Sequence, residues 1–133
     1  MREKSGAGFR ACDRICAGAG GEDKGMSRFG FEEMQEIQRE LQEKYKGRWG
    51  GLSPEKGRSS LLWMITEMGE VADIIKKQGD ESIMQDAQCR HHFVEEMCDV
   101  MMYFNDVMLC YSITPEEIEK VYLEKHHTNM GRW

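Results

Sequence analysis

Apolar residues recur at spacings of three and four along most of the chain beyond residue 30, which is the period of an amphipathic helix. The first such run predicts a helix over 31–45, and its apolar members are Phe31, Met34, Ile37, Leu41 and Tyr45. Gly47 ends this helix. The glycine-rich segment 47–54 that follows predicts a loop.

Two longer apolar runs predict the central helices. Ser53-Pro54-Glu55 has the N-cap and first-position proline of a helix start, but Gly57 follows at once. We therefore expect the second helix to cover 58–77 and to stop at Gly79. After a polar connection, the next apolar run predicts a third helix over 89–110.

The start of a fourth helix is marked by Thr114-Pro115-Glu116-Glu117, which combines an N-cap threonine, a proline and a capping-box glutamate. This helix is expected over 115–127. No run shows the alternation of a β-strand. Helices joined by short connections predict an all-α fold, an antiparallel four-helix bundle.

The first 25 residues differ from the rest of the chain. They are rich in glycine, alanine and charge, and they include Gly18-Ala19-Gly20-Gly21 without lasting periodicity. We expect 1–25 to be a disordered extension. Met26 is then a candidate natural start, and 26–133 form the single domain.

Two acid pairs, Glu67-x-x-Glu70 and Glu96-x-x-Asp99, lie inside the apolar runs of the second and third helices. Residues three apart share a helix face, so each pair directs two carboxylates the same way. Acidic residues on helices are commonly solvated, and one pair alone would favour that reading. Two pairs beside large hydrophobes favour a cation, because buried like charges repel and lose hydration. Oxygen ligands of this kind suit Mg²⁺, with Mn²⁺ as a substitute.

Composition narrows the class of protein. The net charge is −6 for the whole chain, and no basic face for nucleic acid is visible. No apolar run is long enough to span a membrane, and the N-terminus lacks a secretion signal. The cysteines number five, an odd count without a C-x-x-C motif, which favours reduced thiols and a cytoplasmic location. Cys12-x-x-x-Cys16 has no partner pair at zinc-finger spacing.

With the acid pairs on helices two and three, the chain resembles the MazG-like all-α nucleoside triphosphate pyrophosphohydrolases. Glu67-Met68-Gly69-Glu70-Val71 matches the family's E-x-G-E-hydrophobic block. The segment 95–103 matches its E-E-x-x-D-V-x-x-Y block, and 125–132 matches a K-x-x-x-N-x-x-R ending. The three motifs occur in the family's order over about 30–132.

The resemblance implies hydrolysis between the α- and β-phosphates of a nucleoside triphosphate, giving a monophosphate and pyrophosphate. It implies that Glu67, Glu70, Glu96 and Asp99 ligate Mg²⁺, which screens the triphosphate and helps to activate water. One of these carboxylates is a candidate base. Glu95 is a candidate base or supporting residue, and equally a solvated neighbour of the site.

The resemblance also suggests residues that bind substrate, each with a structural alternative. Lys125 and Arg132 would face phosphates, or else complement the dipole at a helix end. Asn129 would hydrogen-bond sugar or base, or cap the helix. Tyr103 shares the face of Asp99, or packs in the core. Trp49 would stack on the base, or anchor its loop.

A unit of this size looks too small to enclose a nucleotide, and family members build the pocket across subunits. A homodimer or homotetramer is therefore expected. Two alternatives stay open: a phosphoribosyl-ATP pyrophosphohydrolase, and a non-catalytic helical oligomer that binds nucleotide. Base preference, sugar preference and the number of metal ions do not follow from the sequence.

Overall fold

A computed structural model describes residues 29–132 of the chain. The predicted extension 1–25 lies outside the described residues. The helices are α2 (Phe31–Lys44), α3 (Lys46–Trp49), α4 (Pro54–Gln85), α5 (Ala87–Cys110) and α6 (Pro115–Met130). The described part contains no strand. The all-α prediction is therefore confirmed.

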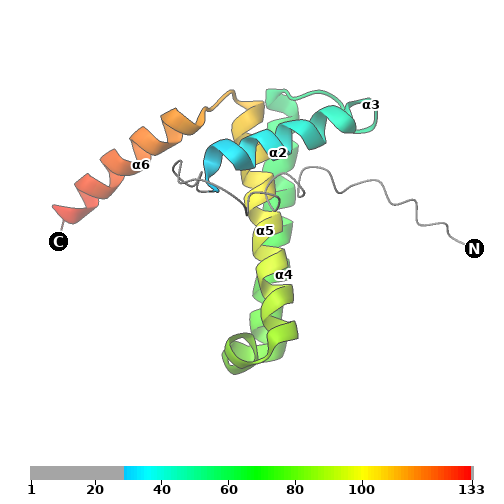
Figure 1. Cartoon of the computed structure of the whole chain (residues 1–133), viewed down its shortest axis with the longest axis vertical. Helices are drawn as coiled ribbons and strands as arrows, with labels where there is room; N and C mark the ends of the chain where they lie inside the picture. Colours follow the sequence, from blue (N-terminus) through cyan, green and yellow to red (C-terminus); the bar gives the residue numbers. More distant parts are fainter. Residues whose placement is uncertain (1–28, 133) are drawn as a thin grey trace, which may run out of the picture.

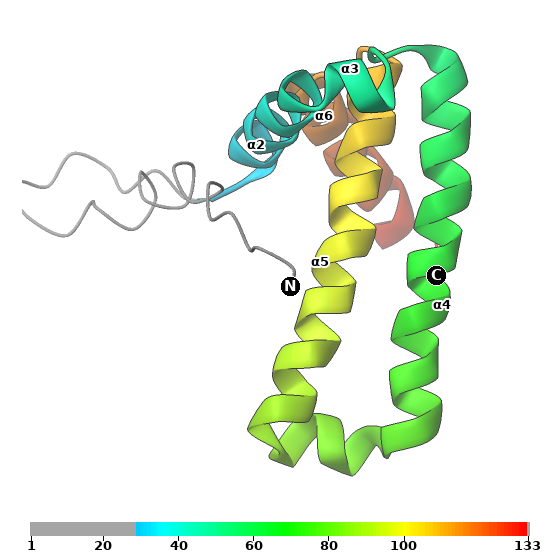
Figure 2. The ribbon, with the colours of Figure 1, turned by 90° about the vertical axis from the view of Figure 1, so that its right-hand side faces the viewer.

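The long helices α4 and α5 form an antiparallel hairpin, as Figures 1 and 2 show. Helix α2 lies across the open end of this hairpin, where α4 begins and α5 ends. Helix α6 leaves from the same end and extends away from the hairpin (Figure 1). A single chain thus supplies a two-helix hairpin with a crossing helix, and a bundle completed by oligomerisation stays a prediction.

The predicted helix boundaries agree with the structure at most ends. The stop predicted at Gly79 appears as a break inside α4, where the glycine adopts φ 81° and ψ 161° before the helix resumes. Positive φ is available to glycine at no steric cost, which explains its place at this corner. The predicted start at residue 58 is wrong, because α4 begins at Pro54 and continues through Gly57. The short helix α3 was expected as loop.

The N-termini of α4 and α6 follow the capping rules. Ser53 Oγ accepts a hydrogen bond from the Lys56 backbone N–H at 3.2 Å. Thr114 Oγ1 accepts one from the Glu117 backbone N–H at 3.2 Å. Each cap is followed by proline, whose missing N–H costs nothing in the first turn. These caps fix where the hairpin and α6 begin.

The seam of the hairpin follows a repeat of alternating spacings of three and four. Its positions on α4 and α5 are all buried or half-buried. Apolar packing along the seam is interrupted by Glu67 on α4 and Glu96 on α5. The seam residues are Ser60, Met64, Glu67, Val71 and Ile74 on α4, and Phe93, Glu96, Val100, Tyr103 and Val107 on α5.

Helix α2 docks on α5 largely through amide groups. Gln35 Nε2 donates to the Ile113 carbonyl at 3.1 Å, and Gln38 Nε2 donates to Asp106 Oδ1 at 2.9 Å. Gln42 is also buried on this face. Buried polar groups of this kind specify one orientation only when they are hydrogen-bonded. Apolar side chains add to this contact, since the ring centroids of Phe31 on α2 and Phe104 on α5 lie 6.3 Å apart.

Apolar side chains are left open on the outside of the hairpin and on α6. The exposed residues on α4 and α5 recur at helical spacings and form one stripe on each helix, which we call the outer stripes. No helix in the described part of the chain is long and apolar enough to cross a membrane. The outer stripes consist of Leu61, Ile65, Met68 and Ile75 on α4, and Val94, Met97, Met101 and Phe104 on α5.

Gly57, near the start of α4, is buried against the end of α5. A Cβ added here would lie 2.7 Å from Tyr111 Cε2 and 3.0 Å from Cys110 Cβ. We predict that Gly57→Ala lowers the free energy of unfolding by about 1–3 kcal/mol, because overpacking forces neighbours to move. Gly69→Ala is the matched control, since nothing lies within 4 Å of its Cβ position.

The control substitution should stabilise by about 0.5–1 kcal/mol, which is the helical preference of alanine over glycine. Denaturant unfolding followed by circular dichroism measures both values. Equal effects of the two substitutions would contradict the close packing at Gly57.

Candidate metal centre and adjoining cavity

Three of the predicted acidic residues meet at the hairpin seam. Glu67 comes from α4, and Glu96 and Asp99 come from α5. One carboxylate oxygen of each lies within 4.8 Å of the other two. The seam spacing turns Glu67 and Glu96 toward the opposite helix, and Asp99 follows Glu96 by three residues on the same face. We call these three residues the acid cluster.

The other two predicted acidic residues lie elsewhere. Glu70 does not belong to the acid cluster, although it is near enough to raise the pKa of Glu67. Glu95 is exposed and faces His91, with 3.2 Å between His91 Nε2 and Glu95 Oε1. Its carboxylate thus has the position of a solvated neighbour. His92 Nδ1 lies 3.7 Å from Glu96 Oε1, at the edge of the cluster.

The electrostatics of the acid cluster favour a bound positive charge. Loss of hydration at the seam raises the pKa of Glu67 above its usual range, and the charges of Asp99, Glu96 and Glu70 raise it further. The carboxylate of Glu67 is therefore held beside like charges. Either a proton or a cation relieves this repulsion.

The donor set fits a magnesium ion. Mg²⁺ takes oxygen ligands at about 2.0–2.1 Å in octahedral geometry and usually keeps several waters. Ligand oxygens around such an ion lie roughly 3–4 Å apart, so small side-chain rotations would bring the acid cluster to that spacing. Three carboxylate ligands would leave positions for water and for a phosphate oxygen.

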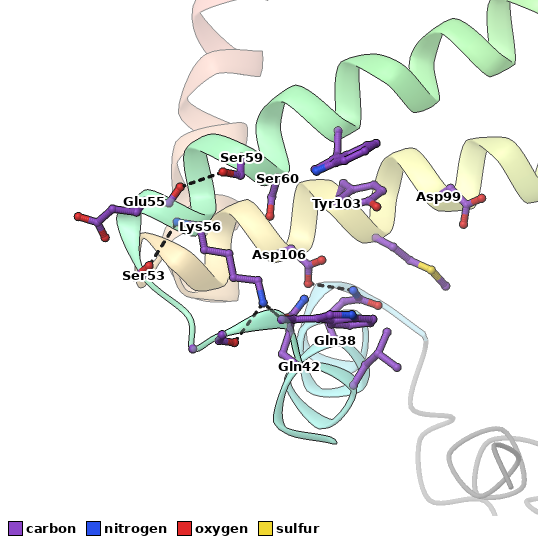
Figure 3. Close-up of a pocket in the computed structure, with 16 residues that line it drawn as sticks. Gln38, Gln42, Ser53, Glu55, Lys56, Ser59, Ser60, Asp99, Tyr103 and Asp106 are labelled. Carbon is purple, nitrogen blue, oxygen red and sulfur yellow. Dashed lines mark hydrogen bonds between the residues drawn. The ribbon is translucent and has the colours of Figure 1, made fainter. Parts of the chain in front are cut away.

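A cavity of about 720 Å³ adjoins the acid cluster at the open end of the hairpin. Asp99 and Tyr103 line it from α5, so the cavity and the cluster share one wall (Figure 3). Its size lies within the range typical of small-molecule sites. The side chains of Trp49 and Trp63 give it aromatic surface.

Helices and loop contribute different chemistry to the cavity. The short helix α3 brings Trp49, whose ring stacks on Tyr45 with centroids 4.6 Å apart. Lys56 Nζ lies 5.7 Å from the centroid of Trp49. Burial raises the pKa of the Tyr103 hydroxyl, and the charges of Glu67, Asp106 and Asp99 add to this effect. Both Trp49 and Tyr103, which the sequence predicts as substrate-binding residues, line the cavity.

A buried polar group that the sequence reasoning missed lies in the cavity wall. Asp106 is 5% exposed and accepts from Gln38 Nε2, while Lys56 Nζ donates to Gln42 Oε1 (Figure 3). Loss of hydration raises the pKa of Asp106, and Gln38, Gln42 and Lys56 oppose this rise. A sequence signal existed, because Asp106 follows Tyr103 by three residues and Asp99 by seven on one helix face.

The remaining predicted residues lie at the C-terminal end of the chain. Lys125 and Asn129 are one helical turn apart on α6, and Arg132 follows the helix. All three are exposed, and none lines the cavity. Helix α6 extends away from the hairpin in Figure 1, so within one chain these residues are separate from the acid cluster.

Comparisons with protein-family models, with curated proteins and with solved structures find no match to this chain.

The raised pKa of Glu67 predicts how the stability of the metal-free protein depends on pH. The folded state holds the Glu67 proton more tightly than the unfolded chain does. Stability should therefore rise as pH falls through the raised pKa and decline as pH increases through it.

At neutral pH, Mg²⁺ should raise the melting temperature by a few degrees, because it binds only the folded state.

Thermal unfolding in EDTA and in Mg²⁺ measures this effect for the wild type and for Glu67→Gln. The variant should be at least as stable as the wild type in EDTA, and Mg²⁺ should raise its melting temperature less. Glu81→Gln, an exposed residue of α4, is the control. An equal response to Mg²⁺ in all three proteins would contradict a cation at the acid cluster.

Proposed function

We propose that the protein is a Mg²⁺-dependent hydrolase that converts a nucleoside triphosphate to the monophosphate and pyrophosphate. The observation that carries the proposal is the continuity of the acid cluster with the aromatic cavity through Asp99. Carboxylates of this kind suit a metal-bound polyphosphate, and the adjoining cavity has the size and aromatic surface for a base. The motif resemblance gives the same function.

The proposal assigns a part to each region of the site. A base in the cavity beside Trp49 places the phosphates toward Asp99, because Asp99 lines the side of the cavity that adjoins the cluster. The Tyr103 hydroxyl lies on this path and offers a hydrogen bond to the sugar or the α-phosphate. Bound Mg²⁺ supplies the charge that offsets repulsion between the phosphates and the carboxylates.

The hydrolytic step uses water as the nucleophile. Glu67 is the one carboxylate of the cluster that comes from α4, and we assign it as the proton acceptor. It accepts a hydrogen bond from the water and takes its proton as the new bond to the α-phosphorus forms. The bond from the α-phosphorus to the bridging oxygen breaks, and pyrophosphate leaves with that oxygen. In this assignment Glu96 and Asp99 hold the cation.

We further propose that the active form is a homodimer or a homotetramer. The outer stripes leave large apolar side chains in solvent on both helices of the hairpin. Contiguous apolar surface of this extent marks an interaction site in a protein of ordinary composition. A second hairpin packed on these stripes would complete a four-helix bundle. The position of α6 also favours an oligomer, because Lys125 and Asn129 would then be free to bind substrate at the site of another subunit.

The hydrolysis is tested by pyrophosphate release from a panel of ribo- and deoxyribonucleoside triphosphates, with and without Mg²⁺. We predict metal-dependent release with one monophosphate formed per pyrophosphate. Glu96→Gln should lower kcat by about 100-fold or more while the circular dichroism spectrum is unchanged, because a ligand that positions the cation is lost. Glu81→Gln on the exposed surface of α4 should keep the wild-type rate.

Absence of pyrophosphate from every nucleotide, with a folded protein in Mg²⁺, would leave a nucleotide-binding oligomer as the better account. Release of inorganic phosphate in place of pyrophosphate would also contradict the proposed bond cleavage.

The oligomer is tested by light scattering coupled to gel filtration. We predict a mass of two or four chains for the wild type. Ile65→Glu, which places a charge in the outer stripe of α4, should give a smaller species because a buried unpaired charge is costly. Lys76→Glu, at an exposed polar position of the same helix, should leave the mass unchanged. A wild-type mass of one chain would contradict the proposal.

A further inference from the structure

Buried hydrogen-bond acceptors form part of the cavity wall. Asp106 is almost fully buried, at 5% exposure, and it lines the cavity from α5. A carboxylate accepts hydrogen bonds and, when ionised, donates none. Its Oδ1 accepts from Gln38 Nε2 at 2.9 Å, which leaves further lone pairs on the carboxylate.

The amide groups beside Asp106 are oriented by it. Gln38 must turn its NH₂ toward the carboxylate, so its carbonyl oxygen is directed elsewhere. Gln38 is 3% exposed, and its Oε1 has no hydrogen-bond partner among the described residues. A buried acceptor without a partner is unfavourable and calls for a donor. Gln38, like Asp106, lines the cavity.

The cationic donor at this end of the cavity already has partners. Lys56 Nζ donates to Gln42 Oε1 and lies 3.4 Å from the Gly50 carbonyl oxygen. Gln42 and Lys56 also act on Asp106, since both oppose the rise of its pKa, whereas Gln38 Oε1 is left without a donor. Figure 3 shows Asp106, Gln38 and Gln42 together on one side of the cavity, with Tyr103 and Asp99 leading toward the acid cluster.

We propose that this wall selects nucleobases that carry an exocyclic amino group, and that Asp106 is the residue that reads it. The inference rests on the proposed function, because it takes the cavity to be the base site of a nucleotide. Aromatic surface from Trp49 holds a flat ring without regard to sequence. The amino group of cytosine or adenine then donates to Asp106, with Gln38 as a second acceptor.

A keto group at the same position is disfavoured for a simple reason. It would place the lone pairs of a carbonyl oxygen against those of a carboxylate, with no proton between them. Buried sites that are built to bind an N–H group discriminate strongly against analogues that lack it. Cytosine and uracil differ in this group and at N3, which is an acceptor in cytosine and an N–H donor in uracil. Adenine and hypoxanthine differ in the same way at the exocyclic group and at N1, so each pair compares an amino-bearing edge with a keto-bearing edge.

The test compares kcat/KM for dCTP against dUTP and for ATP against ITP, in Mg²⁺. The wild type should prefer the amino member of at least one pair by about tenfold or more. Asp106→Asn should reduce or invert this preference, because an amide can turn an NH₂ donor toward a keto group. Gln38→Met should reduce the preference without inverting it.

Gln35→Met is the matched control, because Gln35 is a buried glutamine on the same helix that binds the Ile113 carbonyl outside the cavity wall. This control should lower stability and leave the amino-to-keto ratio unchanged. Equal kcat/KM values for both members of both pairs in the wild type would overturn the proposal. So would an Asp106→Asn variant that loses activity equally on all four nucleotides, since that is the result of a purely structural role.

A binding experiment separates this proposal from the proposed hydrolysis. Calorimetric titration with dCMP, dUMP, AMP and IMP, without metal, requires no turnover. Tighter binding of the amino member, lost in Asp106→Asn, would support the proposal even for a protein that hydrolyses nothing. Hydrolysis that proceeds without any amino preference in rate or binding would keep the proposed function and overturn this one.

Discussion

The repulsion between carboxylates at the seam of a two-helix hairpin is the constraint on which the rest of the structure depends. Glu67 and Glu96 occupy seam positions where apolar side chains would pack, and Asp99 lies beside them. This arrangement raises the pKa of Glu67 and weakens the hairpin unless a positive charge binds. Long helices on both sides tolerate that local cost, because the seam above and below it is apolar. A site of stored repulsion on rigid elements is well suited to hold a cation.

At the open end of the hairpin, helix α2 both packs on the hairpin and lines the cavity. Its buried glutamines attach it to α5 and to the segment after α5, and two of them, Gln38 and Gln42, also line the cavity next to the acid cluster. Helix α2 is packed on the hairpin through buried glutamines at positions where leucine would be usual. Their amide groups therefore lie beside the aromatic surface of the cavity. The outer stripes show the complementary pattern, since large apolar residues are left open where a second copy would cover them. The polar interior and the apolar exterior are the two features on which the proposed ligand binding and the proposed self-assembly rest.

The sequence predicted the helices and most of the acid cluster, because both depend on local spacing. Thr114 and Pro115 mark the start of α6 because they cap a helix, and Gly79 marks the break in α4 because it adopts a positive φ. Glu70 could not be excluded from the cluster in this way. A spacing of three turns a side chain by about 60° around the helix axis, and only the packing of the partner helix decides whether that side chain still faces the seam.

The cavity could not be predicted from the sequence, since Gln38 and Asp106, which meet in its wall, are 68 residues apart in the chain. Lys125 and Asn129 are exposed on α6 and do not line the cavity, so a part for them in the site would require the proposed oligomer.

The most direct test of the account is a crystal structure of the protein with Mn²⁺ and a non-hydrolysable nucleoside triphosphate, using the anomalous signal of manganese. The account predicts an anomalous peak held by carboxylate oxygens of Glu96 and Asp99, with Glu67 and the phosphates beside it. A protein that binds the nucleotide with no manganese at the seam would contradict the claim that these carboxylates exist to hold a cation.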